Sequence, residues 1–248
     1  YVFSVQAHLL PYIEGANLYN LIDFKTAPNF GTPASPMTAN ETAARTKIAV
    51  YQCPSDRVSV PNSEFGVTNY VATTGNGVGG AASIRTGNGV MYSGSNIRFA
   101  DVRDGLSSTV VFSEQTLGTG GRPSSAGGGP PTSSTDEVLE LVSATPTTDA
   151  SCVIGASGST WSGLRGAKWM NGHYGDTMYN HYYSPNSRQF DCGNASHNFG
   201  LTAARSVHTG GVHVLLGGGG VRFVSENINL DTWRAIGTRD GREVPGEF

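Results

Sequence analysis

The stretch that decides the fold is "HTGGVHVLLGGGGVRFVSENI", residues 208–228. Two apolar, β-branched runs flank the glycines 217–220, whose backbone can adopt positive φ in a tight turn. Alternation along a strand places Val212, Val214 and Leu216 on one face. The pattern therefore predicts a β-hairpin with one face in the core. Because no helix follows the glycines, we interpret the turn as scaffold rather than a phosphate cradle.

Four segments upstream of the hairpin are further strand candidates. They are "KIAVYQCPSD" (47–56), "FGVTNYVATTG" (65–75), "NGVMYSG" (88–94) and "STVVFSEQ" (108–115). All are short and end in turn-forming residues, as is typical of the strands of an antiparallel sheet.

Short helices are predicted in three places. Near the N-terminus, apolar residues recur at helical spacing until Pro11, which predicts a short helix followed by a turn. "TDEVLELVS" (135–143) has a Thr or Asp cap before an apolar stripe and is predicted to be helical. "NLDTWRAIGTRDG" (229–241) is predicted to begin with a helix capped by Asn229 or Asp231.

Composition limits the partners that the chain could have. Its 248 residues can bury a core, and we expect one domain, residues 1–248. Charged residues are 14% of the chain, against about 25% in ordinary soluble domains, and the net charge of −3 includes no run of like charges. Nothing therefore favours nucleic acid as a partner. The apolar runs are much shorter than the ~18 residues of a membrane span, so none is predicted.

One low-complexity stretch, "GTGGRPSSAGGGPPTSST" (118–135), has the composition of a flexible linker. We nevertheless expect an ordered Gly-rich loop that is held by a neighbouring segment or chain. Two sequons and one Pro-flanked cluster are candidate glycan acceptors. They are Asn40 and Asn194 for N-linked sugars, and Thr132, Ser133, Ser134 and Thr135 for O-linked sugars.

Local catalytic signatures are absent from the sequence. There is no G-x-S-x-G elbow, no H-E-x-x-H helix and no Walker lysine motif. "GNGVGG" (75–80) matches a dinucleotide fingerprint in form, but glycines interrupt the segment where the required helix would begin. His208 and His213 alone would make a poor metal site, and His208 is expected to hold the strand entry by a hydrogen bond. We predict no enzymatic activity, no cofactor and no metal.

The cysteines, Cys53, Cys152 and Cys192, are widely spaced and form no C-x-x-C pair. They could be buried free thiols of a cytosolic protein, or one disulfide and one leftover thiol in an oxidising compartment. The abundance of Ser, Thr, Asn, Gly and Tyr, with few Lys and Glu, is common in secreted surface proteins. It favours an extracellular or cell-surface location.

The tail "ARSVHTGGVHVLLGGGGVRFVSENINLDTWRAIGTRDGREVPGEF" resembles a family of secreted, pilin-like proteins of unassigned function. Members carry a prepilin-type N-terminal segment and a C-terminal signature of His, nine residues, then Asp-Gly, and some are labelled solute-binding. Six upstream blocks resemble the family in order: "LLPYIEGANLYNLIDF" (9–24), "YQCPSD" (51–56), "TNYVATTG" (68–75), "VRDGLSSTVVFSE" (102–114), "RGAKWMNG" (165–172) and "MYNHYYSPNSRQFDC" (178–192).

The sequence departs from the family pattern in two respects. His208 matches the signature histidine and is followed by Gly210 and Gly211, but Gly218 and Gly219 stand at the Asp-Gly position, so we assign that position no chemical role. The family's hydrophobic N-terminal helix has no counterpart in this sequence, which we expect to begin beyond it.

The resemblance also bears on the cysteines. Family members commonly carry a cysteine just after the hydrophobic helix, and it is the natural partner of Cys53. Cys53 is therefore expected to be unpaired or partner-seeking. Cys152 and Cys192 bracket two of the family blocks, and we predict that they form a disulfide.

The resemblance implies an α+β, pilin-like globular module with an antiparallel sheet, short helices and long ordered Gly-rich loops. It also implies a structural extracellular subunit that assembles with copies of itself into a filament or surface array. The alternative is a secreted solute- or glycan-binding module, in which exposed aromatic rings would stack on sugars. The candidate rings are Trp161, Trp169, Tyr174, Tyr179, Tyr182 and Tyr183.

Overall fold

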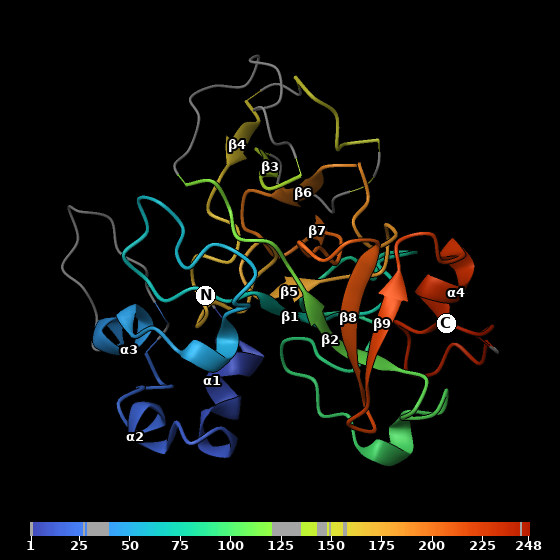
Figure 1. Ribbon diagram of the computed structural model, residues 1–248, viewed down its shortest axis with the longest axis horizontal. Helices are drawn as coiled ribbons and strands as arrows, with labels where there is room; N and C mark the ends of the chain where they lie inside the picture. The colour runs from blue at the N-terminus through green and yellow to red at the C-terminus, as the bar shows by residue number, and fades with distance from the viewer. Residues whose placement is uncertain are drawn as a thin grey trace.

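The computed structural model describes residues 2–26, 28, 40–120, 135–142, 148, 150–155, 158–243 and 245–248. These residues form an α+β fold with short helices and two mixed sheets (Figure 1). The helices are α1 (Val5–Leu9), η1 (Leu10–Tyr12), α2 (Ala16–Tyr19), α3 (Glu41–Arg45), η2 (Ala49–Tyr51), η3 (Phe99–Asp101) and α4 (Leu230–Ala235). The strands are β1 (Tyr70–Thr73), β2 (Val110–Glu114), β3 (Val138–Leu141), β4 (Thr160–Ser162), β5 (Met178–Tyr179), β6 (Asp191–Asn194), β7 (Gly200–Leu201), β8 (Gly211–Leu216) and β9 (Val221–Ser225).

The larger sheet has the order β5-β1-β2-β8-β9, and the smaller sheet has the order β4-β3-β6-β7. Most strand pairs are antiparallel, as predicted, but β1 pairs with β5, and β3 with β6, in parallel, so both sheets are mixed. Each parallel pair is joined by a long connection, which leaves enough chain for the crossover that parallel pairing requires. In Figure 1, α1, α2 and α3 gather on one side of the larger sheet, and α4 lies near β9.

The predicted hairpin is confirmed as β8 and β9, which pair in antiparallel register. Val212, Val214 and Leu216 are buried, and they pack with Trp233 of α4 in one apolar cluster. The opposite face of the hairpin carries Val221, which is 65% exposed. One face of the hairpin therefore packs in the core, and the other face is exposed at Val221.

The helix predicted over 135–143 is wrong, because Val138–Leu141 form β3. β3 lies between β4 and β6, which take its backbone hydrogen bonds on both sides, and all its residues are buried. A short apolar segment does not distinguish a buried strand from a buried helix. The segment forms a strand because β4 and β6, which are distant in sequence, supply its hydrogen-bond partners.

Two of the predicted strands upstream are also wrong. Within 47–56 the chain forms the 3-10 turn η2, in which the buried Tyr51 donates its hydroxyl to the carbonyl of Gln6 at 2.6 Å. Residues 88–94 form turns instead of a strand. The other two candidates are confirmed as β1 and β2.

Of the predicted loop 118–135, only residues 118–120 and Thr135 are among the described residues. The prediction of an ordered, pinned loop therefore stays a prediction for 121–134. The same holds for the O-linked acceptor candidates Thr132, Ser133 and Ser134, which lie outside the described residues. Thr135 is partly exposed.

The predicted cap of the last helix is confirmed. Asn229 precedes α4, and its side-chain oxygen accepts the backbone N–H groups of Asp231 at 2.9 Å and Thr232 at 3.2 Å. Helix starts leave such N–H groups without an intrahelical partner, so the cap stabilises α4. At the N-terminus, the helix ends as predicted around Pro11, where η1 follows α1.

Replacing Asn229 by alanine is expected to lower the free energy of unfolding by about 1 kcal/mol, because two backbone donors lose their acceptor. Urea denaturation followed by tryptophan fluorescence measures this difference. Asn229→Ser is the matched control, since serine keeps a capping oxygen and should restore most of the loss. Equal midpoints for the alanine variant and the native chain would contradict the role of the cap.

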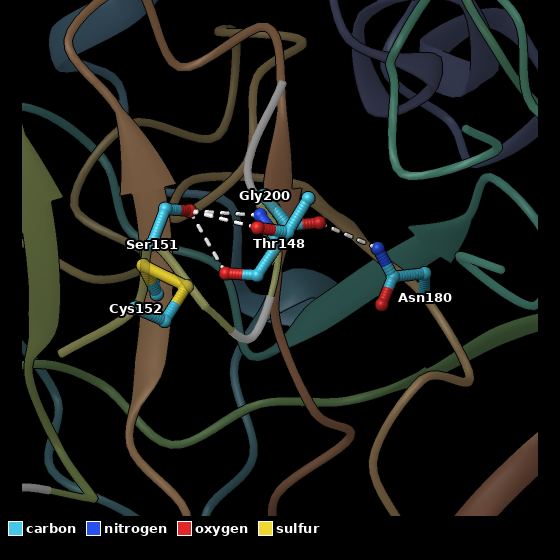
Figure 2. The surroundings of a disulfide bond; sticks show 6 residues. Thr148, Ser151, Cys152, Asn180 and Gly200 are labelled. Carbon is cyan, nitrogen blue, oxygen red and sulfur yellow. Dashed lines mark hydrogen bonds between the residues drawn. A yellow bond between two sulfur atoms is a disulfide. The ribbon is translucent and has the colours of Figure 1, made fainter. Parts of the chain in front are cut away.

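The predicted disulfide is confirmed, with Cys152 and Cys192 joined and their Cα atoms 5.9 Å apart. Figure 2 shows the bond beside the turn of Thr148 and Ser151, where the Ser151 hydroxyl donates to the Thr148 carbonyl at 2.8 Å. Cys192 belongs to β6, so the bond ties this turn to the smaller sheet. Cys53 is a buried free cysteine, as expected.

Among the described residues, no helix combines the length and the apolar character that crossing a membrane requires.

Candidate functional site

An open apolar groove of about 320 Å³ lies over the face of the larger sheet that is opposite to the buried cluster of Val212 and Val214. Leu9 and Ile13, from the α1–η1 region, and Val50 of η2 line one part of it. Phe112, Leu215 and Val221 line the part that belongs to the sheet. Since strand side chains alternate between faces, these sheet residues point away from the buried cluster of Val212 and Val214.

A polar cluster of Cys53, Glu114 and His208 adjoins this groove, and Glu114 lines both. One potential ligand atom from each of the three residues lies within 4.8 Å of the others. The Cys53 Sγ is 3.9 Å from the His208 Nε2, and the Glu114 Oε1 is 3.4 Å from the same nitrogen. A thiol, a carboxylate and an imidazole therefore converge on one small region.

Glu114 reaches the cluster because it is the last residue of β2, next to β8 in the sheet. Its Oε2 accepts the backbone N–H of His213 at 2.7 Å and lies 3.4 Å from the His213 Nδ1. The carboxylate is only 6% exposed. Its second oxygen is thus fixed by β8, while the first faces His208.

Cys53 is held by a side chain that precedes β1. The Cys53 backbone N–H donates to the Oδ1 of Asn69 at 2.9 Å. The Asn69 amide donates in turn to the Asp56 carboxylate at 2.7 Å and to the Gln115 carbonyl at 3.0 Å. Asn69 therefore joins the turn that carries Cys53 to the end of β2.

His208 lies in the turn that enters β8. Its backbone N–H donates to the hydroxyl of Ser206 at 3.1 Å, and that hydroxyl donates to the Gly211 carbonyl at 2.8 Å. Gly210 has a φ of 87°, and a Cβ on Gly211 would lie 2.1 Å from the Val224 carbonyl oxygen. Only glycine fits at both positions, so Gly210 and Gly211 allow the turn that places His208 beside Glu114.

The cluster affects the pKa of the neighbouring Tyr70. Burial raises the pKa of this phenol, and electrostatic interaction with the nearby Cys53 and Glu114 side chains raises the pKa further. The Tyr70 ring also lines the groove. A neutral phenol thus stands between the polar cluster and the apolar surface.

The geometry of the cluster differs from that of a thiol nucleophile with a base and an orienting acid. Such a relay uses both ring nitrogens of the histidine, one for the nucleophile and one for the acid. Here Cys53 and Glu114 both approach the Nε2 of His208. The cluster therefore lacks the contact on both ring nitrogens that a proton relay uses.

The remaining glycines of the family signature belong to the hairpin turn. Gly219 has a φ of 89°, in the region that favours glycine, whereas the N–H of Gly218 donates to the Leu106 carbonyl at 2.9 Å. Of the run 217–220, only Gly219 takes positive φ. Neither Gly218 nor Gly219 belongs to the polar cluster.

Both sequon asparagines are buried, so the folded state disfavours N-linked glycans there. Asn40 is 1% exposed, and its amide donates to the carbonyls of Asp23 and Thr26. Asn194 is 0% exposed, and its amide donates to the Ser196 hydroxyl at 3.1 Å. The Asn40 side chain thus joins two backbone segments, whereas Asn194 holds the local turn, where its Oδ1 accepts the backbone N–H of Phe199 at 3.1 Å.

The aromatic platform expected for a glycan-binding module is not at the surface. Four of its rings are almost completely buried, namely Trp161, Trp169, Tyr174 and Tyr179. Tyr182 and Tyr183 are partly buried against the cluster around the disulfide. Core packing therefore uses these rings.

The fold and site define an α+β chain with one disulfide, an apolar sheet groove and a Cys-Glu-His cluster. The chain belongs to the family described as "Protein of unknown function (DUF1559)", whose model matches residues 2–231. No curated protein and no solved structure matches it significantly.

The sequence did not predict Glu114 as a site residue, and it did not bring Cys53 and His208 together. These two residues are 155 positions apart, so no local spacing links them. The usable signal is that "YQCPSD", "FSE" and "SVH" all lie in the stretches that resemble the family. That signal does not specify which segments pair.

Proposed function

We propose that this chain is a structural, non-enzymatic extracellular subunit that assembles with copies of itself into a filament or surface array. The disulfide supports an oxidising compartment, because such bonds persist in secreted and surface proteins. The resemblance to secreted, pilin-like proteins supports an assembling role. The observation that carries the proposal is the edge of the larger sheet at β9.

β9 ends the strand order of the larger sheet, next to β8. It presents Val221, which is 65% exposed, and Phe223, which is 46% exposed. Natural edge strands are commonly protected by lysine, proline or a bulge, and an unprotected edge favours pairing with another chain. β9 has none of these protections, and its one charged side chain, Arg222, is held by the Phe248 carbonyl at 3.2 Å. β9 is therefore the strand on which a second copy of this chain would pair.

Antiparallel pairing of β9 with β9 of a second copy would extend the sheet and join the two apolar grooves into one face. Such a two-fold contact uses the same residues on both copies and closes as a dimer, so an extended array needs a second surface. Tyr12, which is 83% exposed, and Leu21, which is 58% exposed, offer one in the α1–α2 region. Apolar contacts of this kind are screened little by salt.

The double variant Val221→Lys/Phe223→Lys is expected to abolish self-association, because desolvating two charges at the edge opposes pairing. Sedimentation at micromolar concentration, in low and in high salt, measures the oligomeric state. The control is Val58→Lys, which adds a charge at a valine that is 70% exposed and distant in sequence from β9. It should sediment like the native chain. A native chain that is monomeric at both salt concentrations would contradict the proposal.

A secreted solute-binding module is the second candidate function, and the groove favours it. Its volume of about 320 Å³ is within the range of small-molecule sites, and its lining is mostly apolar. The glycan-binding form of this candidate lacks its expected platform, since the rings are buried. If the native chain is monomeric and binds an apolar fluorescent probe that Leu215→Lys excludes, the solute-binding candidate takes precedence.

Glycosylation of Thr132, Ser133, Ser134 and Thr135 stays part of the proposed extracellular role. Intact mass of the native material decides it. A mass above the 26.0 kDa of the polypeptide is expected if these acceptors are used, and a mass equal to it would remove glycans from the proposal.

A further inference from the structure

We propose that Cys53, Glu114 and His208 form a binding site for a zinc-class divalent ion, held by one sulfur, one oxygen and one nitrogen ligand. The prediction from sequence was that the chain holds no metal, because His208 and His213 alone make a poor site. The structure changes the donor set, since it adds a thiol and a carboxylate that are distant in sequence. This proposal is independent of the assembly proposed above.

Two of the three distances between donor atoms are close to those of one tetrahedral ion. Ligand atoms about 2.0–2.3 Å from zinc, at tetrahedral angles, lie roughly 3.4–3.6 Å from one another. The Glu114 Oε1 to His208 Nε2 distance is 3.4 Å, and the Cys53 Sγ to His208 Nε2 distance is 3.9 Å. The Cys53 Sγ lies within 4.8 Å of the Glu114 carboxylate, so a movement of the thiol side chain by up to about 1 Å would bring all three atoms to bonding distance of one ion.

The surroundings orient two of the three ligands. The backbone N–H of His213 holds the Oε2 of Glu114 at 2.7 Å, which leaves Oε1 for the ion. Asn69 anchors the backbone of Cys53 at 2.9 Å. Metal sites depend on such outer contacts, because they fix each ligand before the ion arrives.

A cavity beside the ligands gives the ion room. It has a volume of about 10 Å³ and is bordered by Cys53, Asp56, Asn69, Glu114 and Gln115 among others. This is close to the space that one water molecule needs. Two of the three ligands, Cys53 and Glu114, border this space, and Ser206 and Val207, which precede His208 in the chain, complete its wall.

The donor types select the ion. Thiolate and imidazole favour zinc and its soft neighbours, whereas calcium and magnesium prefer oxygen ligands alone. Three protein ligands leave a fourth position, which water would occupy. The side chain of His208 is 30% exposed, so solvent reaches the site.

Cobalt(II) titration of the disulfide-intact chain tests the proposal, because cobalt replaces zinc in tetrahedral sites and absorbs visible light. One equivalent is expected to bind, with a sulfur-to-cobalt charge-transfer band that added zinc removes. Cys53→Ser should abolish this band. His208→Asn should weaken binding by at least about tenfold.

The matched control is His197→Asn. His197 has a side chain that is 29% exposed and lies 3.2 Å from Glu140, so it is also a histidine paired with a glutamate, but it is outside the cluster. Asparagine accepts the positive φ of 55° at this position. Binding by this variant should equal that of the native chain. The absence of a charge-transfer band in the native chain would overturn the proposal. So would an equal loss of cobalt affinity in the His208→Asn and His197→Asn variants.

A second measurement uses the native chain alone, in case the variants fold poorly. Zinc is expected to slow alkylation of Cys53 by iodoacetamide at least tenfold, and EDTA should restore the rate, because a bound thiolate is shielded. Calcium is the control ion and should have no effect. Equal rates with and without zinc, or equal protection by calcium, would refute the site.

Discussion

Replacing Asp191 by alanine is expected to lower the free energy of unfolding by about 3–5 kcal/mol, or to prevent folding. The carboxylate is 2% exposed and lies between Arg165, at 2.9 Å, and Arg205, at 2.8 Å. It also accepts the backbone N–H of Ala203 at 3.0 Å. Without Asp191, two buried guanidinium groups lose the anion that compensates them.

Burial destabilises the charged form of the Arg165 guanidinium. Desolvation lowers the pKa of its guanidinium to about 10, and the negative charge of Asp191 opposes that shift. Among the described residues, the Arg165 Nε and Nη1 find no hydrogen-bond acceptor. The cation therefore depends on few contacts, and Asp191 is the nearest charge of opposite sign that the structure shows for it.

Urea denaturation followed by tryptophan fluorescence measures this effect, with Asp191→Asn as a second variant that keeps the shape but removes the charge. Asp101→Ala is the matched control. Asp101 pairs with Arg98 at the surface, at 3.0 Å, and solvent-exposed pairs contribute little to stability. Similar midpoints for the Asp191 and Asp101 variants would contradict the importance of the buried network.

Removing the disulfide with Cys152→Ser/Cys192→Ser is expected to lower the free energy of unfolding by about 4 kcal/mol in the chain-entropy model. The two cysteines are 40 positions apart, so the bond closes a long loop in the unfolded chain. Both residues also pack with Leu139 and Trp161 in one apolar cluster, which adds lost contacts.

The control for the disulfide is Cys53→Ser in the presence of EDTA, because Cys53 is a free thiol. It should leave the urea midpoint nearly unchanged, while the double variant shifts it strongly. Adding a reductant to the native chain should reproduce that shift. A native chain whose midpoint does not change on reduction would contradict the prediction.

Features with short-range causes could be predicted from the sequence. The hairpin of β8 and β9 follows from two β-branched runs around glycines, and α4 follows from the cap at Asn229. In both cases a turn or cap acts on residues a few positions away. The pairing of Cys152 with Cys192 came from the resemblance to a family, and the structure confirms it.

Features that depend on distant partners could not be predicted. Val138–Leu141 form a strand because β4 and β6 lie on either side, although the sequence pattern also fits a helix. The two parallel strand pairs depend in the same way on crossovers. A backbone takes the structure that satisfies its hydrogen bonds, and only the assembled sheet supplies those partners.

The sequence by itself determined the strand-and-turn character of 208–228, the capped helix after it and the low charge of the chain. Only the tertiary structure decided that Cys53, Glu114 and His208 meet. Each comes from a different part of the chain, and each is placed by contacts of its own, with Asn69, with the backbone of His213 and with Ser206. A site made of such parts has no local pattern, because its geometry arises from the pairing of β2 with β8.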